Sequence, residues 1–493
     1  MNISANLPAL VVVLPLIMSV VAAVVPSARI AWGVTLLTVL ASAASALANL
    51  VMNAGSSSSY ELGGWPPPWG IEFVSDGAST LMAVVITGLS VASTLYAKPL
   101  IENEIIREDI PRVYGAWLLT IGGLLGLVMT GDAFNLFVFL EISALSAVIL
   151  IAMGGGRDRR ALPAAYNYLI IGAIGATFYV IGVGFCYAVT GTLNMADLVV
   201  RLPGAAPEPV FVGLAFMVAG MMVKAAAFPV HVWLPAAYGY SPTAVAALLS
   251  AVATKAAIYV LARILFTVFE AMPDITGLIL NWILIPLSLM AMFAGTILAI
   301  YERDLRLMLA QSSIAQIGYI TLAFGIGTTA SLGAGFIHMV NHAMIKGGMF
   351  MAVGALTVAI GRRANIGNID GLGRAMPITG AALLICGLSL IGLPLTAGFI
   401  SKLYLVYAIL DEGYLMITAL VMLSSALSVI YLWKMVEVLW MRPAPKGTAI
   451  RENPWIYGPL WLLAAANIVF GIYATPVIHY ANLAAQSLLG SGG

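Results

Sequence analysis

Four lysines, three histidines and one glutamate stand inside long apolar stretches of this sequence, where charged side chains are rare. Each lysine at mid-membrane depth costs about 2.5–3.5 kcal/mol on insertion scales, so chance does not account for four of them. All three residue types can hold and release a proton, and a series of them can pass protons along. The candidates are Glu141, Lys224, Lys255 and Lys402 for proton translocation, with His231, His338, His342 and Lys346 as a relay.

Three of these candidates recur at intervals of four residues. His338, His342 and Lys346 would step about 6 Å at a time along one helix face, within an arc of roughly 80°. The two histidines could instead hold a metal ion, but no acidic or cysteine ligand stands near them in the sequence. We therefore expect no metal site and no cofactor. Small polar residues of spans 10 and 12 could line water or serve as helix contacts: Ser312, Ser313, Gln316, Tyr319, Ser389 and Ser401.

Glu141 and Lys224 are expected to act as a pair. A lone carboxylate in lipid would be protonated, whereas one beside a lysine can ionise because the opposite charge offsets desolvation. The alternative is a static buried ion pair that fixes helix packing. Pro229 follows Lys224 by five residues and should free the carbonyl of Ala225 as an acceptor. Snorkelling is the alternative for single lysines near helix ends, and it is the favoured interpretation for Lys434.

The composition indicates a membrane protein. Of 493 residues, 61% are hydrophobic and 9% are charged, against about 25% charged residues in soluble domains. No Lys or Arg precedes Arg29, so the first apolar run is expected to be a membrane helix and not a cleaved signal peptide. The two cysteines lie in apolar runs and suggest no disulfide framework. A net charge of +1 gives no reason to expect nucleic acid as a partner.

Apolar runs near the bilayer-crossing length of about 20 residues recur throughout the chain. Alternating ten-residue strands are absent, so the spanning elements are expected to be helices. The fourteen predicted spans are 8–25, 30–52, 77–97, 113–130, 133–153, 162–189, 209–238, 242–263, 276–300, 304–324, 331–359, 378–411, 414–440 and 455–475.

Basic residues alternate between the loops and predict the orientation. The even-numbered loops carry only Arg201 and Arg263, which places the odd-numbered loops in the cytoplasm and both termini outside the cell membrane. The odd-numbered loops carry Arg29, Lys98, Arg107, Arg112, Arg157, Arg159, Arg160, Arg303, Arg306, Arg362, Arg363, Arg374, Arg442, Lys446 and Arg451.

Two predicted spans look interrupted, span 7 by Pro229 and Pro235 and span 12 by Pro394. Such breaks are tolerated at membrane depth only where protein or water satisfies the freed backbone groups. The alternative to a relay role for His231 is a hydrogen bond to that backbone. Breaks five spans apart are typical of two five-helix repeats. The expected organisation is a single membrane domain 1–493, divided into N-terminal helices 1–112, a first repeat 113–263, a second repeat 276–440, and helix 14 with its tail 455–493.

The chain resembles the antiporter-like subunits shared by Mrp-type cation/proton antiporters, respiratory complex I and membrane-bound hydrogenases. The similarity runs from about 77 to 440 and rests on GDAFNLFVFLEIS, MMVKAAAFPVHVWLPAAYGYSPTAVAALLSAVATKAAIY, HMVNHAMIKGGMFMAVGAL and GLSLIGLPLTAGFISKLYLV. The resemblance implies an all-α, polytopic fold of about fourteen transmembrane helices, with two inverted repeats and broken helices 7 and 12.

The same resemblance implies roles for individual residues. Glu141 and Lys224 match the family's glutamate–lysine pair, Lys255 matches the lysine of helix 8, and Lys402 matches the terminal base of helix 12. Helix 11 would supply the connecting histidine and lysine positions. Many relatives carry Asp or Asn after the WLP of helix 7, where this chain has Ala236, which puts a cation-coordinating role for that turn in doubt.

The phrase FNLFVFLEIS looks most like the D-type subunit of Mrp-type antiporters. The resemblance therefore implies a transporter component, not an enzyme, that works with other subunits of a Na⁺/H⁺ antiporter complex in the plasma membrane. The alternative is a proton-pumping membrane-arm subunit of a redox-driven complex of the complex I or membrane-bound hydrogenase type. An organic-solute transporter or a purely structural subunit is a third possibility, against which the row of titratable groups argues.

Overall fold

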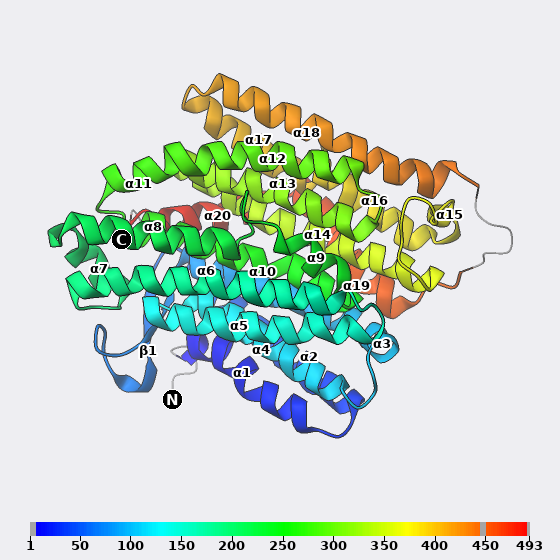
Figure 1. The fold of residues 1–493 in the computed structure, drawn as a ribbon, viewed down its shortest axis with the longest axis horizontal. Coiled ribbons are helices and arrows are strands. Elements are labelled where there is room, and N and C mark those ends of the chain that lie inside the picture. The colour runs from blue at the N-terminus through cyan, green and yellow to red at the C-terminus, as the bar shows by residue number, and fades with distance from the viewer. Residues whose placement is uncertain (1–5, 444–449, 491–493) are drawn as a thin grey trace.

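The structure is a computed structural model that describes residues 6–443 and 450–490. Its helices lie side by side along the long axis of the molecule (Figure 1). Thirteen helices in the described ranges are long and apolar enough to cross a membrane, and the broken twelfth span supplies a further, shorter apolar helix. The all-α, polytopic fold is thus confirmed. Predicted loop residue Lys446 falls outside the described residues.

The helices of the predicted spans follow the chain in order. They are α1 Leu7–Val24, α2 Ala28–Met52, α3 Gly77–Glu104, α4 Ile110–Met129, α5 Ala133–Ala152, α6 Ala161–Thr190, α8 Pro207–Lys224, α9 Trp233–Tyr240, α10 Thr243–Arg263, α12 Ile285–Tyr301, α13 Leu305–Ile326, α14 Thr329–Ile360, α16 Pro377–Ile391, α17 Ala397–Asp411, α18 Leu415–Val436 and α19 Pro454–Ile472. Single 3₁₀ or π turns extend several of them or lie between them: η2 Leu62–Gly64, η3 Met153–Gly156, η4 Leu202–Gly204, η5 Ile264–Val268, η6 Leu280–Leu284 and η7 Glu437–Met441.

Several elements are absent from the sequence prediction. A hairpin of β1 Ser58–Glu61 and β2 Glu72–Ser75 follows α2, and the short helices α7 Met195–Arg201, α11 Pro273–Ile279 and α15 Leu372–Ala375 connect spans. The segment expected to be a tail contains α20 Thr475–Leu488. This helix buries Val477, Ala481 and Ala485 against α3 and α14. Fourteen residues are too few for a membrane span, so α20 gives no hydropathy signal for one.

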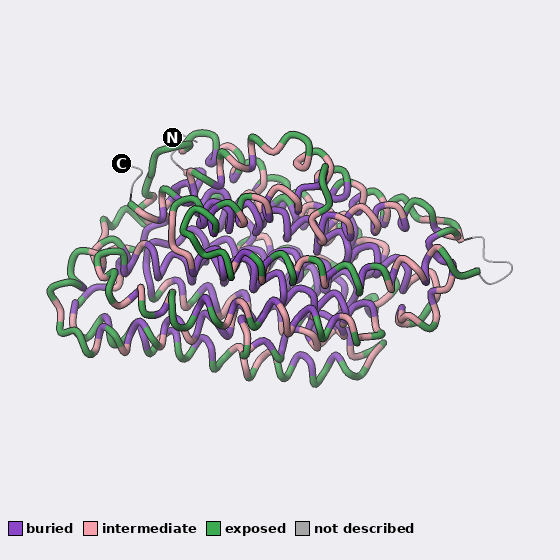
Figure 2. The backbone as a smooth tube through the Cα atoms, turned by 90° about the horizontal axis from the view of Figure 1, so that it is seen from above, coloured by how far each residue is buried: buried purple, intermediate pink, exposed green. Residues whose placement is uncertain are grey.

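The outer surface of the bundle is apolar, unlike that of a soluble protein. Buried residues concentrate along the central helices, and exposed residues lie on the periphery (Figure 2). Large apolar side chains such as Ile17, Leu37 and Met422 are exposed on the outer helices, as expected where lipid is the solvent. α10 and α14 run through the centre: both are buried along almost their whole length. The candidate lysines and histidines are therefore carried mainly by the most enclosed helices.

Both predicted breaks are present, with one difference in position. Span 7 is divided into α8, which ends at Lys224, and α9, which begins at Trp233. The helix therefore already ends at Lys224, before Pro229. The start of the break is thus not set by the carbonyl of Ala225, which the sequence predicts Pro229 to free. Trp233 Nε1 instead donates to the carbonyl of Val223 over 2.9 Å. Span 12 is divided between Ile391 and Ala397.

Each half of the chain contains the same capping arrangement, and the two arrangements lie at opposite ends of the bundle. Asp132 pairs with Asn194 in an isolated bridge and caps α5, and Asp304 pairs with Asn365 and caps α13. α5 starts beside the hairpin, through the bridge Phe73–Thr130. α13 starts at the opposite end, where Arg363 joins Asp304 to the loop that follows α5. The two helices therefore run in opposite directions, as the expected inverted repeats require, while the repeat boundaries stay a prediction.

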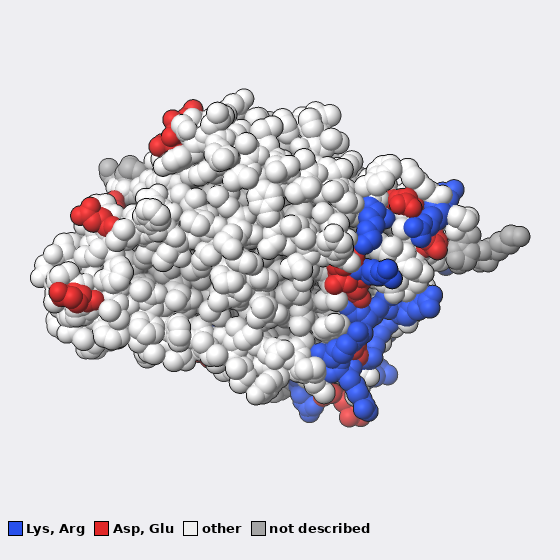
Figure 3. Space-filling view, turned by 45° about the horizontal axis from the view of Figure 1, so that its top comes forward, with Lys and Arg blue, Asp and Glu red and all other residues white. Residues whose placement is uncertain are grey.

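Charge is unevenly distributed between the two ends of the bundle. Lys and Arg side chains gather at one end of the visible face, whereas the opposite end shows isolated acidic side chains (Figure 3). α15 lies at the basic end, and the hairpin and α20 lie towards the other end (Figure 1). The described ends of the chain lie near the hairpin, because Leu7 shares a pocket with Ser58, and Gly490 shares another with Glu72.

Gly398 makes the closest backbone approach at the break of span 12. A Cβ at this position would lie 1.8 Å from the carbonyl oxygen of Ser389. We therefore expect Gly398→Ala to reduce the free energy of unfolding by about 1–3 kcal/mol, the usual cost of overpacking, measured by thermal unfolding of the purified protein. Gly458→Ala is the matched control, because a Cβ there meets nothing within 4 Å. Equal midpoints for the two variants would contradict the prediction.

Candidate proton-translocation axis

The three residues of α14 form the centre of the candidate site. His338, His342 and Lys346 are all buried on this helix. The two imidazole rings lie parallel, with centroids 6.1 Å apart and an interplanar angle of 4°, which confirms the step predicted from their spacing. Both ring nitrogens of His342 are buried without a hydrogen-bond partner in the described part of the chain.

α13 and α17 supply the hydrogen-bond partners of this row. His338 Nδ1 lies 2.8 Å from Ser401 Oγ, and its Nε2 lies 3.0 Å from Gln316 Oε1. Lys346 Nζ donates to Ser312 Oγ over 2.5 Å and to the carbonyl of Leu309 over 2.9 Å. Several small polar residues singled out in the sequence therefore contact the titratable groups directly.

Lys402 extends the row to the break of span 12. Its Nζ donates to the carbonyls of Leu390 and Ile391 over 3.0 and 2.8 Å, and to Ser425 Oγ over 2.9 Å. The ammonium also lies 5.0 Å from the ring centroid of Tyr319. That ring lies 5.8 Å from His338, so an aromatic side chain joins the end of the row to its centre.

Lys255 joins the row from the other side. It is 1% exposed on α10, and its Nζ donates to the carbonyl of Ser250 on the same helix. Lys255 interacts electrostatically with both His342 and Lys346. The structure thus brings five of the eight candidates together: Lys255, His338, His342, Lys346 and Lys402.

Lys224 lines a small cavity beside α10, the helix that carries Lys255. The cavity has a volume of about 30 Å³ and is lined by Tyr168, Trp233 and residues Leu249, Ala253 and Ala257 of α10. A volume of about 10–15 Å³ is enough for one water molecule. The gap between Lys224 and the helix that carries Lys255 can therefore be hydrated.

Glu141 lies near Lys224 but does not form a close ion pair with it. The two residues interact electrostatically, yet no nitrogen–oxygen distance between them is within the 4.0 Å of an ion pair. Glu141 Oε1 is buried and has no hydrogen-bond partner among the described residues. The close contact that a static ion pair needs is thus not present, and neither is a close contact for the expected functional pair, so the roles of both residues stay a prediction.

Two other lysine and histidine positions lie apart from the row. His231 stands in the break of span 7, where its ring stacks on Phe228 at 5.3 Å. Lys434 Nζ donates to the carbonyls of Ile300 and Glu302 over 3.1 and 2.9 Å. Lys434 therefore anchors a helix end, in line with its expected place near the interface.

A buried ion pair that sequence reasoning missed lies at the hairpin end. Arg263 is expected in a loop, but it is buried at the end of α10 and bonds to Asp76 over 2.7 and 3.0 Å. The Arg263 guanidinium also donates to Tyr259 Oη, and Tyr259 donates to the carbonyl of Val128 over 2.9 Å. One feature of the sequence could have indicated that Arg263 is buried: Lys255, Tyr259 and Arg263 are spaced four residues apart and so lie on one helix face.

This ion pair lines a large cavity. The cavity has a volume of about 610 Å³ and includes Glu72, Asp76, Thr130, Tyr259 and Arg263 in its wall. Glu72 is held by Asn194 Nδ2 at 2.6 Å and by Ser59. A chamber with charged side chains in its wall therefore lies at the hairpin end, about two helical turns from Lys255 along α10.

Residues 130–428 match the family described as "NADH:quinone oxidoreductase/Mrp antiporter, TM". The chain belongs to this family. The matched range contains all eight candidate residues and both broken spans. The protein is accordingly a multi-pass membrane subunit of the antiporter-like type, a transporter component and not a catalytic enzyme.

Individual relatives come from both branches of the family. The N-type subunit of NADH-quinone oxidoreductase from Desulforudis audaxviator is 40% identical, covering 96% of this chain and 97% of the relative. The D-type subunit of the Na⁺/H⁺ antiporter from Alkalihalophilus pseudofirmus is 30% identical over 87% of this chain and 86% of the relative. A chain of the Mrp complex from Dietzia sp. superposes with a TM-score of 0.90 at 27% identity, covering 99% of this chain and 98% of that one.

The Asp76–Arg263 pair is expected to be a major stabilising contact. Arg263→Gln or Asp76→Asn leaves one charged partner buried, which should lower the free energy of unfolding by about 3–5 kcal/mol. Thermal unfolding of the purified protein measures this change. The double variant should lose less than the two single losses combined, because the partners are coupled.

Arg201→Gln is the matched control for this prediction. It breaks an ion pair with Asp197 in which the Arg201 side chain is 47% exposed, and exposed pairs contribute at most about 1 kcal/mol. If Arg263→Gln destabilises the protein no more than Arg201→Gln does, the buried pair is not the contact described here.

Proposed function

We propose that this chain translocates protons as a subunit of a multisubunit Na⁺/H⁺ antiporter, along an axis from Glu141 and Lys224 through Lys255 to Lys402. The observation that carries the proposal is the near-continuous row of titratable groups across α10, α14 and α17. Three of its members bond to small polar side chains over 2.5–3.0 Å, its two imidazoles lie parallel, and Lys224 lines a cavity large enough for water.

Movement along the axis is coupled through charge. Each buried amine or imidazole changes the proton affinity of its neighbour, so the groups titrate as a set and not one by one. A proton that arrives at Lys255 alters the charge felt by His342 and Lys346, with which it interacts. His342 has unpaired nitrogens on both sides of its ring, which suits a group that accepts on one side and donates on the other.

The orientation proposed for the chain places the basic end in the cytoplasm and both termini outside. Basic loops on the cytoplasmic side are the general rule for membrane proteins, and the described ends of the chain lie opposite the basic end. In this orientation the 610 Å³ chamber at Asp76 and Arg263 faces the outside. It is then the opening closest along α10 to the axis lysine Lys255.

A second candidate function is favoured by one comparison. The 40% identity to an N-type subunit of NADH-quinone oxidoreductase over 96% of this chain supports a membrane-arm component of a redox-driven complex. The same axis would serve there, with electron transfer in other subunits. In either case the chain works beside partner subunits in the membrane, as its relative does in the Mrp complex.

His338 and Lys402 are expected to be essential for translocation. His338→Gln keeps hydrogen-bonding groups for Ser401 and Gln316 but cannot carry a proton, so proton flux should fall about a hundredfold. Lys402→Ala should have a similar effect. Dissipation of a pH gradient in inverted vesicles that contain the whole complex measures the flux. Lys434→Ala is the matched control and should retain flux within about twofold, because Lys434 only anchors a helix end. Full flux in the Lys402→Ala variant would refute the proposed axis.

The driving ion separates the two candidate functions. Inverted vesicles of wild type and Lys224→Ala are given Na⁺ or, separately, an electron donor. If Na⁺ dissipates a preformed pH gradient in wild type but not in the variant, the antiporter function holds. If an electron donor builds a gradient and Na⁺ has no effect, the protein belongs to a redox-driven pump.

A further inference from the structure

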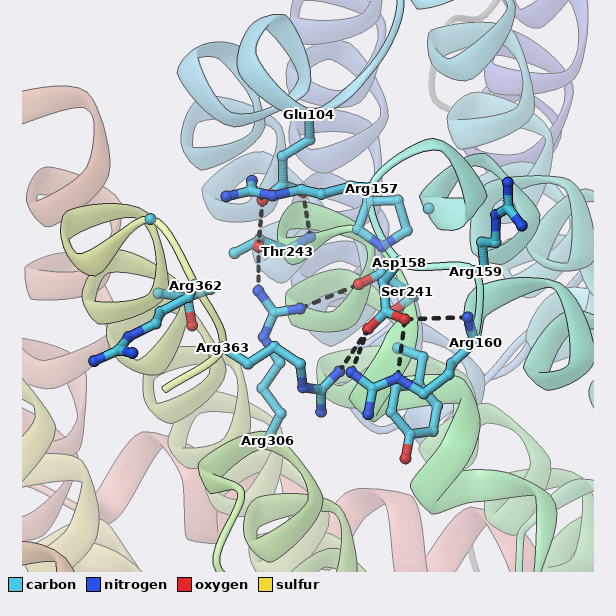
Figure 4. A pocket seen from close by; sticks show the side chains of 15 residues that line it. Glu104, Arg157, Asp158, Arg159, Arg160, Ser241, Thr243, Arg306, Arg362 and Arg363 are labelled. Atoms are coloured by element: carbon cyan, nitrogen blue, oxygen red, sulfur yellow. Dashed lines mark hydrogen bonds and ion pairs between the residues drawn. The ribbon is translucent and has the colours of Figure 1, made fainter. Parts of the chain in front are cut away.

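The basic end of the molecule contains a pocket that the proton axis does not use. It has a volume of about 360 Å³ and lies where the loop after α5, the turn between α9 and α10, the start of α13 and the segment after α14 meet. Figure 4 shows its charged lining from close by. The charged residues of the wall are Arg157, Arg159, Arg160, Arg306, Arg362 and Arg363, with Glu104 and Asp158.

The two carboxylates of the wall, together with Asp304 that pairs with Arg363, cannot neutralise six guanidiniums. Glu104 accepts from Arg157 over 3.0 Å, and Asp158 accepts from Arg160 over 2.8 Å and from Arg363 over 3.3 Å. The hydrogen bond from Arg160 keeps the pKa of Asp158 below its ordinary value, so this carboxylate is already ionised at neutral pH. The excess of positive charge is therefore a property of the folded pocket and not of a particular protonation state.

Three arginines keep unused donor capacity. Arg363 donates to Asp304 and Gly239, yet its Nη2 is buried without a hydrogen-bond partner among the described residues. Arg159 and Arg362 are exposed and extend from opposite rims of the pocket (Figure 4); neither has an ion-pair partner within 4.0 Å in the described ranges. Planar guanidiniums with free donors are the usual ligands for phosphate oxygens.

An apolar track leads away from the pocket along α6. This helix begins at Ala161, directly after Arg160, and Leu162, Tyr166, Ile170 and Ile174 are all exposed on it. Residues four apart lie on one face of a helix, so these side chains form a continuous stripe towards the membrane centre. A headgroup at the arginines would place its acyl chains beside this stripe.

We propose that the pocket binds the phosphate headgroup of an anionic phospholipid, with the acyl chains along the exposed face of α6. Basic pockets between transmembrane helices on the cytoplasmic side are suited to such headgroups. Because the pocket connects elements of both halves of the chain, a bound headgroup would hold α6, α10 and α13 together at this end.

The test uses the purified whole complex in a neutral detergent, titrated with phosphatidylglycerol or phosphatidylcholine while its thermal unfolding midpoint is recorded. We expect phosphatidylglycerol to raise the midpoint at a concentration at least about tenfold lower than phosphatidylcholine does, and this preference should weaken with salt. Inorganic phosphate and glycerophosphate are titrated in parallel. If they reproduce the whole effect, the site binds free phosphate and the lipid assignment is wrong.

Variants with opposite expected effects make the test specific. Arg159→Gln combined with Arg362→Gln removes two free guanidiniums without breaking an ion pair, and should weaken phosphatidylglycerol binding about tenfold or more. Asp158→Asn removes a competing carboxylate and should strengthen it. Arg29→Gln replaces an exposed arginine in the first turn of α2, away from the pocket, and as the matched control should leave binding unchanged. Equal affinity for both lipids, or unchanged binding in the double variant, overturns the proposal.

Discussion

The cost of placing charge in a low-dielectric interior determines how this bundle is built. An ammonium or carboxylate taken out of water is tolerated only when hydrogen-bond acceptors or an opposite charge replace its hydration. The buried cations meet this demand in two ways. Arg263 is neutralised by Asp76, whereas Lys255, Lys346 and Lys402 are held by backbone carbonyls and hydroxyls. Neutral acceptors leave an amine free to change its protonation state, which a carboxylate partner would oppose.

The broken helices provide the acceptors that an intact helix lacks. The last carbonyls of a helix have no intrahelical donor and carry the negative end of its dipole. Lys402 reaches back to the end of α16, and Lys224 is itself the last residue of α8. The break of span 12 therefore supplies the backbone acceptors that hold the buried Lys402 amine.

The fold was largely predictable because its signals are local. Apolar runs of membrane-spanning length, prolines in spans 7 and 12, and basic loops each report on a short window of sequence. Side-chain partners are different, because they depend on helix rotation and register. Asp76 and Arg263 are 187 residues apart, and no local pattern links them. The roles of Ser401 and Gln316 could be suspected from polarity alone, but only the packing of α13 and α17 on α14 assigns both to His338.

The distribution of unsatisfied atoms explains why the row is not simply a stabilising network. An unpaired buried polar atom costs about 1–3 kcal/mol, and such atoms occur on His342, on Glu141 and on Asn341 beside His342. Lys346 and Lys402, in contrast, have at least two acceptors each. A proton passes only between groups that are hydrogen-bonded directly or through a water molecule. His342, between the better-bonded lysines, is therefore the position where the proposed path needs a water molecule or a side-chain movement to complete it.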